Sequence, residues 1–172
     1  MNQRIVDLVI EEPAWLEVLP DLQEIADRAA ALALKHLPAD YGDGEICIMA
    51  CDDARIADLN RQFRDKASAT NVLSWPAFEL ASDTPGAIPN FPPKTEASEV
   101  PLFLGDVAIA LQTVEAEANA ASKPLKNHVL HLILHGSLHL LGYNHETPED
   151  AELMEGIESR AMLAEGMPDP YA

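Results

Sequence analysis

Residues 129–145 read V-L-H-L-I-L-H-G-S-L-H-L-L-G-Y-N-H and form the most distinctive stretch of this 172-residue chain. Leucine, isoleucine and valine are the commonest residues beside and between the histidines up to residue 141, so the segment predicts a central apolar helix from about Pro124 to Leu141. Gly142 can adopt the left-handed conformation that ends a helix and turns the chain back. The apolar run is too short, and too often interrupted by histidine, to span a bilayer.

The spacing of three histidines in this stretch predicts a metal site. His135 and His139 are four residues apart, which on a helix places them about 40° apart around the axis and one turn apart along it. Both imidazoles can then point at one ion, and the chain that returns after Gly142 can bring His145 to the same ion. Three imidazoles with one open position are typical of a catalytic zinc site. We therefore expect one Zn²⁺ per chain on His135, His139 and His145, at a site that nickel, cobalt or copper could also occupy.

Two further histidines precede these three. His131 lies eight residues before His139, which is about 12 Å along a straight helix. One ion with metal–nitrogen bonds of about 2 Å cannot reach both rings. We expect His131 and His128 to form hydrogen bonds or to lie at the edge of the site.

The histidine pattern is also similar to the metzincin skeleton H-E-x-x-H-x-x-G-x-x-H. Gly136 stands at the position where those metalloproteases have the glutamate that acts as general base. The pattern therefore favours a metal hydrolase whose substrate is not a peptide.

The charge of the chain restricts how it could bind nucleic acid. The formal net charge is −18, which repels nucleic acid at long range, so contact with RNA requires a local basic patch. Four of the eleven basic residues lie within twelve positions, namely Arg55, Arg61, Arg64 and Lys66. A solvated helix face is the alternative interpretation of this cluster.

Several features predict a cytoplasmic protein with no membrane partner. The first residues, Met1 to Ile5, contain no apolar run long enough for a signal peptide. Cys47 and Cys51 are the only cysteines, and their spacing offers no second pair for a zinc clamp, so we interpret them as reduced core thiols.

The whole chain, residues 1–172, predicts a single α+β domain. We expect a small mixed β-sheet packed with about five helices, and a metal site at the end of the central apolar helix. Residues 79–101 hold five prolines and several acids, and predict a long mobile loop. The expected strands are 4–10, 45–50, 70–75 and 104–111; the expected helices are 21–35, one capped by Asp52 or Asp53, 113–121, 124–141, and 148–165 with Thr147 as its N-cap.

Four segments resemble the YbeY family of bacterial endoribonucleases, which are also described as ribosomal-RNA maturation factors. Their sequences match the family's L-N-x-x-[YF]-R-x-K, T-[DN]-V-L-S-F-P, G-D-I-x-I and H-x-x-x-H-G-x-L-H-L-x-G-[YF]-D-H motifs. The matching residues are 59–66 (LNRQFRDK), 70–76 (TNVLSWP), 105–109 (GDVAI) and 131–145. In three places the chain departs from the family: Asn144 replaces the usual Asp, Trp75 replaces the usual Phe, and the acidic segment 79–101 is longer.

This resemblance implies a zinc-dependent single-strand endoribonuclease with an α+β fold. It implies a role in the 3′-end maturation of small-subunit (16S) rRNA and in ribosome quality control. The implied partners are single-stranded or ribosomal RNA, the small ribosomal subunit and its assembly proteins. The resemblance also implies His135, His139 and His145 as zinc ligands and Arg64 as a functionally important arginine in a cleft near the metal.

Several alternatives remain open at this point. Arg64 could hold a phosphate oxygen during catalysis, or it could form a surface salt bridge. Asp106 is a weak candidate for a general base and is more typical of a turn or cap residue. Attack by water and attack by the ribose 2′-hydroxyl both fit the sequence. The chain could also be a non-catalytic ribosome assembly factor with a structural zinc, or a metal hydrolase of another substrate.

Overall fold

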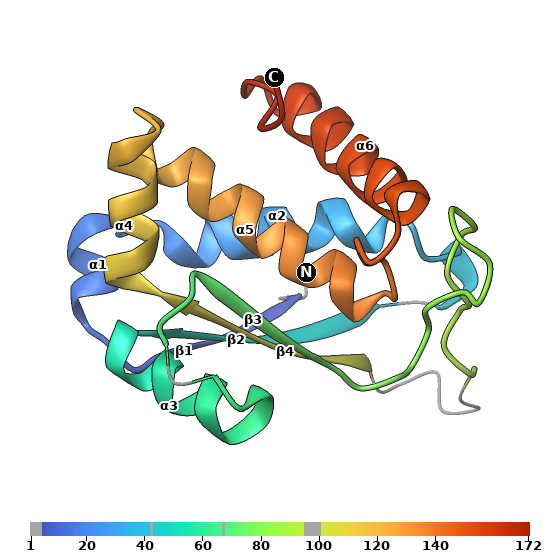
Figure 1. The fold of residues 1–172 in the computed structure, drawn as a ribbon, viewed down its shortest axis with the longest axis horizontal. Coiled ribbons are helices and arrows are strands. Elements are labelled where there is room, and N and C mark those ends of the chain that lie inside the picture. The colour runs from blue at the N-terminus through green and yellow to red at the C-terminus, as the bar shows by residue number, and fades with distance from the viewer. Residues whose placement is uncertain (1–4, 42, 67, 95–100) are drawn as a thin grey trace.

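The computed structural model describes residues 5–41, 43–66, 68–94 and 101–172, which fold around a mixed four-stranded sheet (Figure 1). In spatial order the strands are β1 (Val6–Ile10), β2 (Gly44–Cys51), β4 (Leu102–Ala110) and β3 (Val72–Pro76). The strands β1, β2 and β4 are parallel, and β3 is antiparallel to β4 and forms one edge. The predicted α+β class and the mixed sheet are therefore confirmed.

The described residues contain six α-helices, one more than the sequence predicts. The additional helix is α1, whose five residues are too few to show a hydrophobic period. It is fixed by Trp15, which is fully buried and donates its indole N–H to the carbonyl of Cys51 at 2.8 Å. The helices are α1 (Ala14–Val18), α2 (Leu22–Leu34), α3 (Asp53–Arg64), α4 (Leu111–Ala120), α5 (Leu125–Leu140) and α6 (Pro148–Ala164), with a short 3₁₀ turn at Ala39–Tyr41.

Side-chain caps explain where the helices α3 and α6 begin. The side chain of Asp52 accepts a hydrogen bond from the backbone N–H of Arg55 at 2.8 Å, which caps α3. Thr147 accepts one from the backbone N–H of Asp150, and Pro148 occupies the first position of α6. The structure thus selects Asp52 from the two predicted caps and confirms Thr147.

The helices cover both faces of the sheet. In Figure 1, α2 and α5 lie over one face, α3 lies over the other, and α6 lies above α5. Gly136 lets α5 approach the sheet closely, because a Cβ at this position would lie 3.0 Å from Val107 and 3.3 Å from Val72. None of the helices in the described part of the chain has the length and apolarity needed to cross a membrane.

The described part of the proline-rich connection, residues 79–94, packs onto the domain in several places. Leu80, Pro89 and Pro92 are buried, and the Pro92 carbonyl accepts a hydrogen bond from the Tyr41 hydroxyl at 2.7 Å. The backbone N–H of Gly86 donates to Asp150 at the start of α6. The expected mobility of segment 79–101 stays a prediction, and its residues 95–100 lie outside the described residues.

Candidate metal centre

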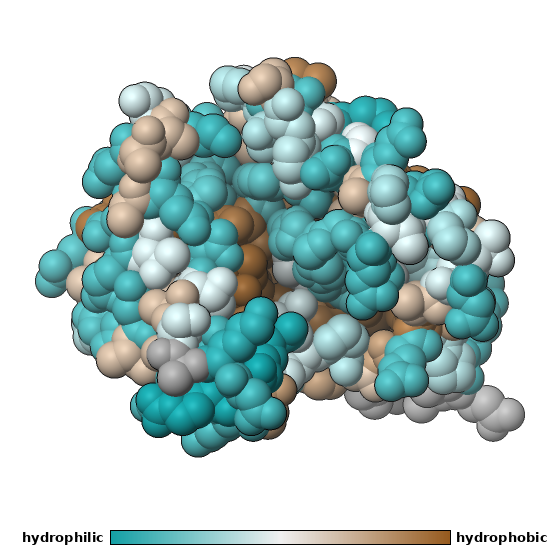
Figure 2. Space-filling view, in the orientation of Figure 1, coloured by the Kyte–Doolittle hydropathy of each residue, from teal (hydrophilic) through white to brown (hydrophobic). Residues whose placement is uncertain are grey.

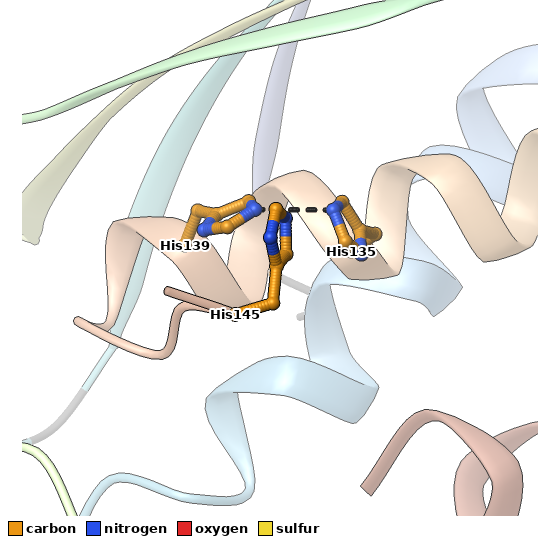
Figure 3. Close-up of side chains that lie close together, drawn as sticks. All are labelled: His135, His139 and His145. Atoms are coloured by element: carbon orange, nitrogen blue, oxygen red, sulfur yellow. Dashed lines mark hydrogen bonds between the residues drawn. The ribbon is translucent and has the colours of Figure 1, made fainter. Parts of the chain in front are cut away.

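The three predicted histidines come together at the C-terminal end of α5 (Figure 3). The ring centroids of His135 and His139 are 4.6 Å apart, and that of His145 lies 5.5 Å from the first and 5.1 Å from the second. One ligand nitrogen of each ring lies within 4.8 Å of the other two. His145 is exposed and the other two rings are partly buried, so the cluster is accessible from solvent.

The glycine after α5 brings His145 back to the helix. Gly142 has a φ of +98°, and its N–H donates to the carbonyl of His139 at 3.0 Å. The next residue, Tyr143, donates its N–H to the carbonyl of Leu138 at 3.1 Å. These two bonds close the last turn of the helix and reverse the chain, which confirms the predicted role of Gly142 as the helix stop.

The surface around α5 is mainly hydrophilic (Figure 2). Apolar side chains show through a hollow near the middle of this face, where Figure 1 places α5. Between Val129 and Leu140 the apolar side chains of α5 are themselves buried, and the partly exposed residues of this stretch are His131, His135 and His139.

The hydrogen bonds of two rings test whether the cluster suits a metal ion. Nδ1 of His135 faces a carboxylate oxygen of Glu158 at 2.9 Å, and Nδ1 of His139 faces the carbonyl of Tyr143 at 2.9 Å. Both partners only accept, so in the neutral rings each Nδ1 carries the proton. The two Nε2 atoms then present lone pairs to each other at 3.0 Å, an arrangement that a cation between them would stabilise. The residues present therefore fit a metal ion.

Burial keeps one of these rings neutral. Burial, helped by the neighbouring imidazoles of His135 and His145, lowers the pKa of His139 to about 4, although the Tyr143 carbonyl and the Glu158 carboxylate act to raise it. At neutral pH the ring is therefore uncharged and its Nε2 carries no proton, as a metal ligand requires.

The other two histidines of α5 bind carboxylates. His128 lies 2.8 Å from Glu117, and His131 hydrogen-bonds to Glu158 of α6. The expectation that these rings form hydrogen bonds is confirmed. His131 and His135 also form, with Glu158, a second group of possible ligands.

The sequence analysis did not identify Glu158. Its side chain is completely buried and hydrogen-bonds to His131, His135 and the hydroxyl of Tyr171. Burial alone would raise the pKa of this carboxyl, but the hydrogen bonds outweigh it and lower the pKa to about 2. One feature of the sequence could have identified Glu158. It is a charged residue on the face of α6 that is otherwise apolar, next to Ile157 and one turn from Met154 and Met162.

Arg64 ends α3 and is exposed. Its Nη2 donates to the carbonyl of Ser74 in β3 at 3.0 Å. Elsewhere in the predicted basic cluster, Arg55 pairs with Glu11 and Arg61 pairs with Asp58, both at 3.2 Å. These ion pairs of Arg55 and Arg61 agree with the solvated helix face that the sequence allowed for the cluster. The salt bridge considered for Arg64 is not found among the described residues, where its side chain contacts a neutral carbonyl.

Asp106 is not the turn or cap residue that the sequence suggests. It lies in the middle of β4, paired with Cys47 of β2 and Trp75 of β3. The next residue, Val107, packs against Gly136 of α5, and neighbouring side chains in a strand point to opposite faces. Asp106 therefore faces away from the helix that carries His135 and His139.

Asn144 and Trp75, the two residues that depart from the family motifs, both contact nearby residues. Asn144 accepts a hydrogen bond from the backbone N–H of Glu146 through its side-chain oxygen at 3.1 Å. An amide forms this turn as a carboxylate would. Trp75 packs edge-on against the exposed ring of Phe63, with centroids 5.7 Å apart.

The two cysteines are free thiols. Cys51 is buried and Cys47 is half-buried, and burial raises their pKa values to about 12 and about 11. Both thiols are protonated at neutral pH, and neither joins a group of possible metal ligands among the described residues. The predicted core position is confirmed for Cys51, whereas Cys47 is only half-buried; the reduced state of both thiols stays a prediction.

Comparison with known proteins identifies the family. Residues 12–165 match the family model described as Endoribonuclease YbeY. The chain belongs to the YbeY endoribonuclease family. It is 51% identical to the Endoribonuclease YbeY of Ruegeria pomeroyi over 96% of this chain and 97% of that protein, and 48% identical to that of Cereibacter sphaeroides over 97% and 98%.

A solved structure shows the same fold. The solution structure of TM1509 from Thermotoga maritima aligns with a TM-score of 0.52 and 20% identity, over 94% of this chain and 91% of that one. The family resemblance drawn from the motifs is confirmed by the family model and by the two relatives, which cover nearly the whole chain.

Proposed function

We propose that this chain is a zinc-dependent endoribonuclease of single-stranded RNA that acts in the 3′-end maturation of 16S rRNA and in ribosome quality control. One observation carries the proposal: three imidazoles of a YbeY-family chain converge on one point, with ligand nitrogens within 4.8 Å of one another. A role on ribosomal RNA would place the chain in the cytoplasm.

In this proposal His135, His139 and His145 hold one ion. When bound, zinc supplies Lewis-acid chemistry, because it withdraws charge from a phosphate oxygen and makes an attacking hydroxyl more acidic. The chain's own contribution is to present unprotonated Nε2 atoms from His135 and His139, whose Nδ1 atoms already donate to Glu158 and Tyr143. Exposure of His145 leaves the site open to a phosphodiester.

Arg64 is the residue that we assign to the phosphate. A guanidinium can bind a phosphate through two parallel N–H groups and offset charge that develops there. The carbonyl of Ser74 holds one end of the group at 3.0 Å on the edge strand β3, which packs beside α5. Arg64→Ala should abolish RNA cleavage while zinc stays bound, and Arg61→Ala is the matched control from the same helix turn. Unchanged cleavage by Arg64→Ala would remove Arg64 from the mechanism.

Two modes of attack fit the proposal, and the products distinguish them. A 2′,3′-cyclic phosphate end would identify the ribose hydroxyl as nucleophile, and a linear phosphate end would identify water. The position after the first histidine supplies no base, because Gly136 faces Val107 and has no room for a longer side chain.

The direct test combines metal analysis with cleavage. Purified protein should contain one zinc per chain and should cut a 16S rRNA fragment that carries the 3′ end, and a chelator should stop the cleavage. A protein without metal, or cleavage that is indifferent to chelator, would contradict the proposal. A general protease screen should show no peptide turnover.

The net charge of −18 favours a second candidate, a non-catalytic assembly factor that binds basic ribosomal proteins and uses zinc only to stabilise its fold. His139→Ala distinguishes the two functions. A catalytic site loses cleavage and keeps its fold, whereas a structural zinc site loses its fold as well.

A further inference from the structure

Behind the three histidines lies a completely buried carboxylate, that of Glu158 in α6. A buried carboxylate is costly unless hydrogen bonds compensate for the water it has lost. This one has three partners from three parts of the chain. His131 and His135 lie on α5, and Tyr171 lies next to the C-terminal residue.

The two carboxylate oxygens divide these partners between them. Oε1 accepts from Nδ1 of His135 at 2.9 Å. Oε2 accepts from Nε2 of His131 and from the hydroxyl of Tyr171, the latter at 2.6 Å. The Tyr171 ring also packs edge-on against the His131 ring, with centroids 5.7 Å apart. Oε1 therefore hydrogen-bonds to His135, whereas Oε2 hydrogen-bonds to His131 and Tyr171.

The C-terminal segment that carries Tyr171 is itself anchored to α6. One oxygen of Asp169 accepts from the hydroxyl of Ser159 at 2.7 Å and from the backbone N–H of Tyr171 at 2.9 Å. Ser159 directly follows Glu158, so the same helix turn holds both the carboxylate and the tail that contacts it.

We propose that Glu158, held in place by Tyr171, is a positioning residue that fixes the proton of His135 on Nδ1 and so directs its Nε2 lone pair to the metal. The C-terminal tail is thereby part of the metal centre. This inference rests on the metal site of the proposed function. A carboxylate that accepts from a metal-binding imidazole orients the ring and makes it a stronger ligand, and loss of such a partner typically costs 10- to 100-fold in metal affinity.

His131, His135 and Glu158 could instead bind a second ion. The hydrogen bonds argue against this, because an ion there would need His135 to lose its Nδ1 proton. It would also have to enter a pocket whose carboxylate has no exposure. We therefore expect one ion per chain, and two ions would overturn the assignment of Glu158 as a positioning residue.

The first measurement is zinc affinity, by competition with a chromogenic chelator on the full chain. We expect Glu158→Gln to bind zinc 10- to 100-fold more weakly than wild type, and Tyr171→Phe to show a smaller loss in the same direction. The matched controls are Glu155→Gln, an exposed acid one turn earlier on α6, and Tyr41→Phe, whose hydroxyl bonds to Pro92. Both controls should bind as wild type does.

The second measurement needs no metal. Imidazole nitrogen shifts in the NMR spectrum of the metal-free protein should show His135 protonated on Nδ1 in wild type, with a mixture of Nδ1 and Nε2 protonation in Glu158→Gln. Tyr171→Phe preserves this test if Glu158→Gln fails to fold. Wild-type affinity in a folded Glu158→Gln variant, or an Nε2 proton on His135 in wild type, would overturn the proposal. Failure of wild type to bind zinc with the expected tautomer present would instead count against the proposed function.

Discussion

Gly142→Ala tests how the chain is turned after α5. A φ of +98° is left-handed, and a residue with a Cβ pays about 1–2 kcal/mol there. The new Cβ would also lie 2.7 Å from the backbone carbonyl carbon of Leu80 and 2.9 Å from Cβ of Pro89. Relief of such overpacking costs a further 1–3 kcal/mol or so. We therefore expect the free energy of unfolding to fall by about 2–5 kcal/mol.

Substitutions at two other glycines separate the conformational cost from the packing cost. Gly166 has a φ of +76° with no atom within 4 Å of a Cβ, so Gly166→Ala should lose only the conformational part, about 1–2 kcal/mol. Gly156 lies within α6 and would meet only the flexible end of Arg160, so Gly156→Ala should be neutral or stabilising by up to about 1 kcal/mol.

Urea unfolding of the metal-free variants measures these differences, and zinc competition measures the effect on the site. Because His145 follows the turn by three residues, Gly142→Ala should also weaken zinc binding, while Gly166→Ala should not. If Gly142→Ala lost no more stability than Gly166→Ala, the close packing of segment 79–94 against the turn would be refuted.

Three other outcomes follow from the site. The metal-free protein should lose up to about 3 kcal/mol of its free energy of unfolding between pH 6.5 and pH 4, because the pKa of His139 is lowered to about 4 in the folded state and the unfolded chain binds the proton first. Acid titrations followed by circular dichroism should show a weaker dependence of stability on pH for His139→Gln. An equal dependence in the two proteins would contradict the lowered pKa of His139. Zinc at 100 times its Kd should raise the free energy of unfolding by about 2.7 kcal/mol, and chelator should reverse this in calorimetry; no shift would exclude specific binding. Arg64→Ala should reduce the slope of log affinity for single-stranded RNA against log salt by about 0.7, and an unchanged slope would mean that Arg64 contacts no phosphate.

Local signals explain why most of the elements could be predicted. Asp52, Thr147 and Gly142 each satisfy or terminate a helix end through bonds to residues within a few positions, so their roles are visible in sequence. Helix α1 has no such signal. Its position depends on Trp15 reaching the carbonyl of Cys51, a contact across 36 positions that no local pattern reveals.

The same difference between local and long-range contacts decides which residues of the site the sequence predicts. His135, His139 and His145 lie within eleven positions, so helix geometry and one glycine predict their convergence. Glu158 reaches His135 across 23 positions and a helix–helix contact. Asp106 was misplaced because β4 begins at Leu102, two residues before the strand that its sequence predicts, so this residue lies within a strand and not near its end.

The charge distribution bears on which substrate the site would receive. A net charge of −18 repels an RNA phosphate beyond short range, and two arginines of α3 are already paired with Glu11 and Asp58. Attraction to naked RNA then comes mainly from short-range groups, among them Arg64 and a bound metal ion. A basic ribosomal protein beside the RNA reverses the sign of the long-range interaction, because the acidic surface is drawn to it. Under the proposed function, this electrostatic argument predicts that RNA within an assembling ribosomal particle is a better substrate than the same RNA free in solution.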